Sequence, residues 1–125
     1  MLKNILLVGF GGGIGSIARY LCQKYLYEWY PNPFPLGTFL VNILGCFLIG
    51  LVYGLSEKGN LLTPEWRMLL TTGFCGGYTT FSTFAFDNVN LLKNNDFLYF
   101  GLYTGGSVIF GISFTFFGMA IFKLI

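Results

Sequence analysis

The chain has 125 residues, of which 54% are hydrophobic and 10% are charged, and its net charge is +2 at pH 7. Soluble domains carry about 25% charged residues, so this composition excludes an ordinary soluble domain and predicts a multi-pass cell-membrane protein in contact with lipid. The small net charge argues against nucleic acid as a partner. Histidine is absent, which removes the commonest metal ligand and proton shuttle.

Apolar runs follow one another along the chain, and each is long enough to cross a membrane. A crossing of the ~30 Å hydrocarbon core needs about 20 apolar residues in a helix. The predicted helices span about residues 3–27, 35–55, 64–92 and 97–123. We therefore expect residues 1–125 to form a single all-α domain of four transmembrane helices, with both chain ends on the same side.

Proline and capping residues mark the connections between the runs. Pro31, Pro33 and Pro35 forbid a regular helix after the first run. A polar connection at residues 56–65 follows the second run, and its Thr63-Pro64 pair is typical of an N-cap followed by proline at the first helical position. These signals separate the first three predicted helices.

The third run contains the segment 73–84, which reads GFCGGYTTFSTF. Gly73, Gly76 and Gly77 weaken a helix at its centre, because each glycine costs roughly 1 kcal/mol relative to alanine. We expect the third helix to be broken near its centre, at Gly76–Thr79. Inside a bilayer, irregular backbone is tolerated only where it is buried in protein or lines a cavity, so the function is sought here.

Aromatic rings and hydroxyls alternate directly after these glycines. Phe81 and Phe84 have the i, i+3 spacing that places both rings on one helix face. Aromatic ring edges carry partial positive charge, and neutral hydroxyl donors can replace the water of a small anion without trapping it. An anion path is one interpretation of this pattern. Core packing of the rings and hydrogen bonding between helices are the other.

Neutral polar residues recur elsewhere in the predicted membrane interior, and the acids do not. The neutral donors are Thr38, Asn42, Thr79, Thr80, Ser82, Thr83, Tyr103, Thr104 and Ser107. All five acids, by contrast, are expected at or near helix ends: Glu28, Glu57, Glu65, Asp87 and Asp96. No catalytic pair or metal cluster is visible, so we do not expect an enzyme.

Basic residues are spread over both predicted sides of the membrane. Four lie on the side of the chain ends and two on the other: Lys3, Lys58, Arg67 and Lys123 against Lys24 and Lys93. Lysine and arginine on cytoplasmic flanks normally set the orientation, and here the bias is weak. Such a chain could insert both ways, and the two orientations could pair as an antiparallel dimer.

Three segments together resemble the Fluc/CrcB family of fluoride channels. They are GGGIGSIARY at 11–20, GTFLVNILGCFLIG at 37–50 and GFCGGYTTFSTF at 73–84. The resemblance covers essentially the whole chain in order. It implies a dual-topology antiparallel homodimer with two pores, which exports fluoride passively and so protects a microbial cytoplasm.

The resemblance also implies roles for particular residues. Arg19 matches an arginine near a pore entrance, and the carbonyls of Gly76 and Thr79 match those that hold a structural Na⁺ at the dimer two-fold axis. The expected fluoride path is formed by Asn42, Phe81, Phe84, Ser82, Thr83, Thr38, Tyr103 and Ser107.

The alternative is a small dual-topology, proton-coupled multidrug or cation exporter. Such an exporter needs a carboxylate embedded in the membrane to exchange protons for its substrate. The first predicted helix has none, and Glu28 lies at its far end. A purely structural membrane subunit would leave the clustered hydroxyls beside a helix break without a role. We therefore favour the fluoride channel.

Overall fold

A computed structural model describes residues 1–59 and 61–124. Asn60, in the predicted polar connection 56–65, and Ile125, at the end of the predicted domain, lie outside the described residues. The regular elements of the described part are helical. They are α1 (Leu2–Trp29), α2 (Leu36–Glu57), α3 (Pro64–Met68), the π-helix η1 (Leu69–Cys75), α4 (Gly76–Tyr78), α5 (Phe81–Lys93) and α6 (Phe97–Leu124).

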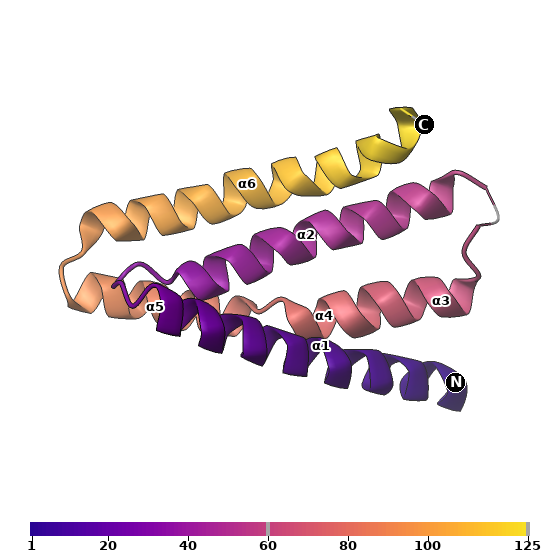
Figure 1. The fold of residues 1–125 in the computed structure, drawn as a ribbon, viewed down its shortest axis with the longest axis horizontal. Coiled ribbons are helices and arrows are strands. Elements are labelled where there is room, and N and C mark those ends of the chain that lie inside the picture. The colour runs from indigo at the N-terminus through magenta and orange to yellow at the C-terminus, as the bar shows by residue number, and fades with distance from the viewer. Residues whose placement is uncertain (60, 125) are drawn as a thin grey trace.

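The elements form four crossings side by side, and the third crossing is built from α3, η1, α4 and α5 (Figure 1). Among the described helices, α1, α2 and α6 are each long and apolar enough to span a membrane. Figure 1 places both chain ends at the same end of the bundle as the α2–α3 connection. The prediction of an all-α protein with four crossings and a broken third helix is confirmed. The outer bounds of the four observed crossings differ from the predicted bounds by at most two residues.

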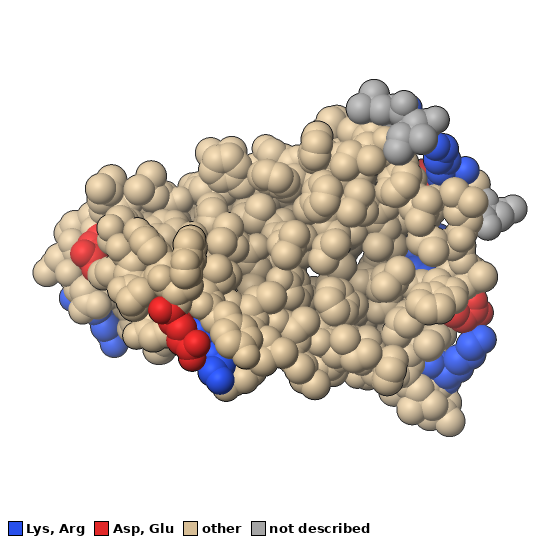
Figure 2. Space-filling view, viewed as in Figure 1, with Lys and Arg blue, Asp and Glu red and all other residues tan. Residues whose placement is uncertain are grey.

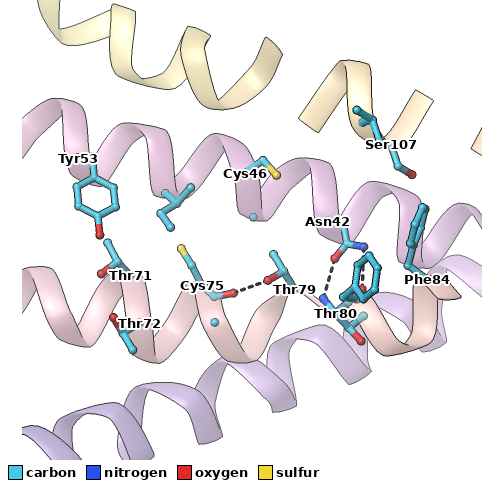
Figure 3. Close-up of a pocket in the computed structure, with 15 residues that line it drawn as sticks. Asn42, Cys46, Tyr53, Thr71, Thr72, Cys75, Thr79, Thr80, Phe84 and Ser107 are labelled. Carbon is cyan, nitrogen blue, oxygen red and sulfur yellow. Dashed lines mark hydrogen bonds between the residues drawn. The ribbon is translucent and has the colours of Figure 1, made fainter. Parts of the chain in front are cut away.

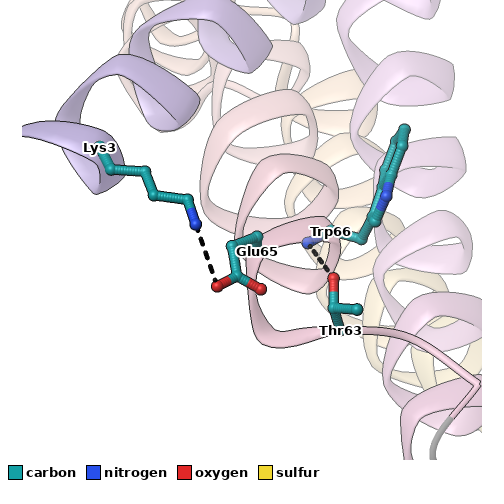
Figure 4. A network of polar contacts seen from close by, with 4 residues as sticks. All are labelled: Lys3, Thr63, Glu65 and Trp66. Carbon is teal, nitrogen blue, oxygen red and sulfur yellow. Dashed lines mark hydrogen bonds and ion pairs between the residues drawn. The ribbon is translucent and has the colours of Figure 1, made fainter.

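Charged side chains lie at the two ends of the bundle, as one face shows in Figure 2. Between the ends, this face has a broad band without charged side chains. At the end that holds the N-terminus, Lys3 Nζ lies 3.3 Å from Glu65 Oε1 (Figure 4). Such an exposed pair contributes little to stability. This distribution of charge matches a protein whose middle faces hydrocarbon.

Local signals explain where the third crossing begins and where the last turn lies. Thr63 caps α3 as predicted, because its Oγ1 accepts a hydrogen bond of 3.2 Å from the backbone N–H of Trp66 (Figure 4). Pro64 is the first helical residue. Between α5 and α6, Asn95 has φ 59°, a left-handed conformation that asparagine tolerates better than most residues.

Small residues allow the helices to approach closely. α2 packs along α6, and α1 packs against η1 and α4. A Cβ on Gly54 of α2 would lie 2.8 Å from the carbonyl oxygen of Met119 in α6, and a Cβ on Gly15 of α1 would collide with the carbonyl oxygen of Phe74. Both contacts require glycine, as expected where membrane helices touch through their backbones.

The break in the third crossing lies later than predicted. Gly76, Gly77 and Tyr78 remain helical as α4, and the backbone becomes extended at Thr79 (φ −90°, ψ 160°) and Thr80 (φ −151°, ψ 120°). The expected position, Gly76–Thr79, is therefore corrected to Thr79–Thr80. Glycine lowers the cost of leaving a helix, but the hydrogen bonds of Thr80 decide where the chain leaves it.

Candidate ion path beside the broken helix

The side-chain amide of Asn42, in α2, forms hydrogen bonds with the backbone of Thr80 at the break. Its Nδ2 donates to the Thr80 carbonyl over 3.1 Å, and its Oδ1 accepts from the Thr80 backbone N–H over 2.8 Å (Figure 3). One side chain thus satisfies both polar backbone groups of an extended residue inside the bundle, where unpaired groups are costly. The second N–H of the amide is an additional donor.

Thr80 also begins α5. Its Oγ1 accepts a hydrogen bond of 3.2 Å from the Thr83 backbone N–H, which is the N-cap arrangement, and it donates to Thr83 Oγ1 over 3.1 Å. The Oγ atoms of Thr80 and Ser82 lie 3.4 Å apart. Part of the predicted row of hydroxyls is therefore engaged in starting the helix.

The break removes the regular helical donors of the carbonyl groups of Gly76, Gly77, Tyr78 and Thr79, because α4 ends at Tyr78 and α5 begins at Phe81. Thr80 N–H, which would bind the Gly76 carbonyl in a continuous helix, binds Asn42 instead. Thr83 N–H, which would bind the Thr79 carbonyl, binds Thr80 Oγ1. The oxygen atoms of Gly76 and Thr79 are thus among the carbonyls released by the break.

The other side of the break faces α1. Arg19 Nε donates to the Gly77 carbonyl over 3.0 Å, and Ser16 Oγ lies 3.5 Å from the same oxygen. Arg19 is only partly exposed. Its Nε is bound to the backbone of the third crossing.

An open groove of about 600 Å³ is lined by residues of α2, the third crossing and α6. Figure 3 shows labelled side chains from α2, the third crossing and α6 around it. The lining residues at and beyond the break are Asn42, Gly76, Thr79, Thr80, Phe81, Phe84 and Ser107, and those of the other half include Cys46, Tyr53, Thr71, Thr72 and Cys75.

The groove brings together some of the predicted site residues and leaves others outside. Asn42, Phe81, Phe84 and Ser107 line it together with both predicted sodium ligands. The remaining predicted residues do not line it: Arg19, Thr38, Ser82, Thr83 and Tyr103.

The two phenylalanine rings are adjacent, as their spacing predicts. The ring centroids of Phe81 and Phe84 are 5.7 Å apart, and Phe84 lies 5.0 Å from the ring of Tyr103. Phe84 is half-buried, whereas Phe81 is 79% exposed within the single chain. Phe84 therefore lines the groove and also packs against the buried ring of Tyr103, whereas Phe81 projects from the subunit.

Ser107 supplies an uncommitted polar atom. Its Oγ is buried and has no hydrogen-bond partner among the described residues. Buried hydroxyls are normally satisfied. A hydroxyl that is unpaired and lines a groove is suited to bind something that enters it.

The chain matches a family model over residues 6–119, described as "CrcB-like protein, Camphor Resistance (CrcB)". The chain belongs to the CrcB-like family. A relative from Gloeothece citriformis is 51% identical over 122 residues, or 98% of both chains. One from Leptospira interrogans is 46% identical over 97% of this chain and 95% of its own. One from Nitratidesulfovibrio vulgaris is 40% identical over 99% of this chain and 100% of its own. Each of the three is named "Fluoride-specific ion channel FluC".

This CrcB-like chain also contains a buried polar cluster that the sequence analysis did not assemble. Tyr103 Oη donates to Asp87 Oδ2 over 3.0 Å, and Gln23 Nε2 donates to Thr38 Oγ1 over 3.0 Å. Thr38 and Tyr103 are both buried. The predicted path residues outside the groove thus have hydrogen-bond partners of their own.

Asp87 corrects one expectation about the acids. We expected it at or near a helix end, but it lies in the middle of α5 and is half-buried. The expectation is wrong because α5 begins at Phe81 and continues beyond Asp87 to Lys93.

Proposed function

We propose that this protein is a fluoride-selective channel that exports fluoride passively across the cell membrane and lowers its cytoplasmic concentration. It is a transport protein and not an enzyme. The observation that carries the proposal is the full-length similarity, at 40–51% identity, to proteins named as fluoride-specific channels. The groove beside the broken helix adds a physical basis.

An anion that enters this groove would lose water, and the groove supplies substitutes for that water. The donors are the second N–H of Asn42 and the unpaired hydroxyl of Ser107. Phe81 and Phe84 offer ring edges with partial positive charge. None of these groups carries a full positive charge, which in a low-dielectric site would hold an anion too strongly to let it pass.

We propose that the working protein is an antiparallel homodimer. The single chain leaves Phe81 79% exposed beside an open groove, and a second copy would enclose both. Six of the seven basic residues are divided between the two ends, as described above, so the charge bias toward one orientation is weak. An inverted partner would give each dimer two equivalent grooves in opposite directions.

A structural Na⁺ fits the released carbonyls. The oxygen atoms of Gly76 and Thr79 lose their helical donors at the break, and unwound carbonyls in membrane helices are the groups that coordinate Na⁺. The ion would satisfy these carbonyl acceptors and would add a positive electrostatic field near the anion path. Gly76 is exposed in the single chain, so a site shared with a second copy is sterically accessible.

Asp87 is the observation that favours the alternative exporter, because a carboxylate within a membrane helix is the group that such an exporter needs. However, its carboxylate already accepts a hydrogen bond from the Tyr103 hydroxyl, and Asp87 does not line the groove. The exporter would couple cation movement to protons, whereas a channel would pass fluoride down its gradient without proton exchange.

The deciding experiment is fluoride efflux from liposomes that contain the purified protein, measured with a fluoride electrode. Chloride-loaded liposomes are the comparison. We expect rapid fluoride efflux, little chloride efflux and no dependence on an imposed proton gradient. Equal chloride efflux, or fluoride efflux only with a proton gradient, would contradict the proposal.

A further inference from the structure

The contact between Arg19 and Gly77 places a cation at the carbonyl end of α4. The helical segment before the break ends at Tyr78, and the carbonyls of a helix end form the negative pole of its dipole. Arg19 Nε lies 3.0 Å from one of these carbonyls. An arginine within a membrane helix is costly unless it is paired, and this carbonyl is the partner that the structure provides for its Nε.

The last residues of α4 and the break contact different surroundings. Gly77 is bound from the α1 side by Arg19 and Ser16, whereas Gly76 and Thr79 line the groove on the opposite side of the crossing. Asn42 binds Thr80 on the groove side. Holding Gly77 toward α1 restricts rotation of the adjoining peptide group that carries the Gly76 carbonyl, whereas the peptide group that carries the Thr79 carbonyl is held by Asn42 through the Thr80 N–H.

We propose that Arg19 is a positioning residue that holds the Gly77 carbonyl toward α1 and thereby aims the neighbouring Gly76 carbonyl at the cation site. This inference rests on the sodium site proposed above. It differs from a role at the pore entrance, where the charge of Arg19 would act on the anion and any cationic side chain would serve.

Three substitutions separate the donor from the charge. In Arg19→Gln the amide Nε2 lies the same number of bonds from Cα as the arginine Nε, so the donor to Gly77 is kept and the charge is lost. Arg19→Lys keeps the charge but has a methylene at that position. Arg19→Met has neither donor nor charge at nearly the same length. Arg67, which is exposed on α3, receives the same three substitutions as a control.

The primary measurement is the thermal unfolding midpoint of the purified protein in detergent as NaCl replaces choline chloride at constant ionic strength. The Na⁺ concentration for half of the stabilisation reports the site without any transport. We expect Arg19→Gln to stay within about threefold of wild type, while Arg19→Lys and Arg19→Met need about tenfold more Na⁺, equivalent to ~1.4 kcal/mol. The Arg67 variants should match wild type.

Other patterns overturn the proposal. A wild-type Na⁺ response in Arg19→Lys with a loss in Arg19→Gln would mean that the charge acts. A wild-type response in all three variants, or an equal loss in all three, would also contradict a donor role. If Arg19→Met does not assemble, the contrast between Gln and Lys still decides. A wild-type protein without Na⁺ stabilisation would overturn this inference and the sodium site together, and fluoride efflux would show separately whether the channel function stands.

Discussion

Asn42 holds Thr80 by both of its backbone polar groups, with distances of 3.1 Å to the carbonyl and 2.8 Å to the N–H. A side-chain amide of α2 thereby replaces the helical partners that Thr80 would have in a continuous helix. The second N–H of the same amide has no hydrogen bond to any described residue, and Asn42 lines the groove. In the proposed channel, this one side chain would both support the break and contact the permeating anion.

Asn42→Asp should reduce fluoride efflux by at least about tenfold, a barrier increase of ~1.4 kcal/mol. The aspartate keeps an acceptor for Thr80 N–H, but it removes the donor and adds a negative charge that repels an anion in a low-dielectric groove. Liposome efflux tests this, with Asn94→Asp in the turn after α5 as the control for added charge. Unchanged efflux from Asn42→Asp would place the path elsewhere.

Phe81→Ile and Phe84→Ile should each lower fluoride efflux sharply while the dimer still assembles. Isoleucine remains apolar but lacks the electropositive ring edge. If the rings only pack, the swap should cost roughly 1.5 kcal/mol or less and leave transport intact. Phe86→Ile is the matched control, because Phe86 lies on the same helix, is 64% exposed and does not line the groove. Efflux and cross-linking of the dimer are measured on all three variants.

Reporter tags at the C-terminus should appear on both sides of the membrane, because the basic residues give only a weak bias. Adding two or three lysines to the turn between α5 and α6 should drive most chains into one orientation. Efflux should then fall, because these chains would lack an inverted partner. Co-expression of two variants with opposite added bias should restore it. A single orientation of the unmodified protein would contradict the antiparallel dimer.

Gly15→Ala should destabilise the protein by about 1–3 kcal/mol, the usual cost of overpacking, because the new Cβ would collide with the Phe74 carbonyl. Gly13→Ala is the control on the same helix. It has nothing within 4 Å of an added Cβ, and alanine favours a helix by up to ~1 kcal/mol. Thermal unfolding in detergent should separate the two variants, and equal midpoints would show that α1 does not pack so closely.

Tyr103→Phe should destabilise the bundle by about 1–3 kcal/mol, since the half-buried Asp87 carboxylate would lose its donor. Tyr99→Phe is the comparison, because Tyr99 lies on the same helix as Tyr103 and its ring also packs against Phe34. The Tyr99 hydroxyl has no hydrogen bond among the described residues. Unfolding midpoints test the stability. Efflux by Tyr103→Phe at the wild-type level would remove Tyr103 from the predicted path.

Some features of this protein are encoded in short stretches and could be read from the sequence. The four crossings follow from apolar runs of sufficient length. The adjacency of Phe81 and Phe84 follows from helical spacing, and their centroids are 5.7 Å apart. The cap at Thr63 also depends only on residues next to it. Each of these signals involves neighbours within a few residues, so no knowledge of the tertiary fold was needed.

The tertiary structure decided the features that depend on distant partners. The break lies at Thr79–Thr80, not at the glycines before it, because Asn42, 38 residues away, binds Thr80. Arg19 contacts Gly77 across 58 residues of sequence, and Tyr103 contacts Asp87 only because α5 and α6 are packed together. Glycine and hydroxyl residues make a break inexpensive, but which peptide groups leave the helix is settled by the side chains that neighbouring helices bring to them.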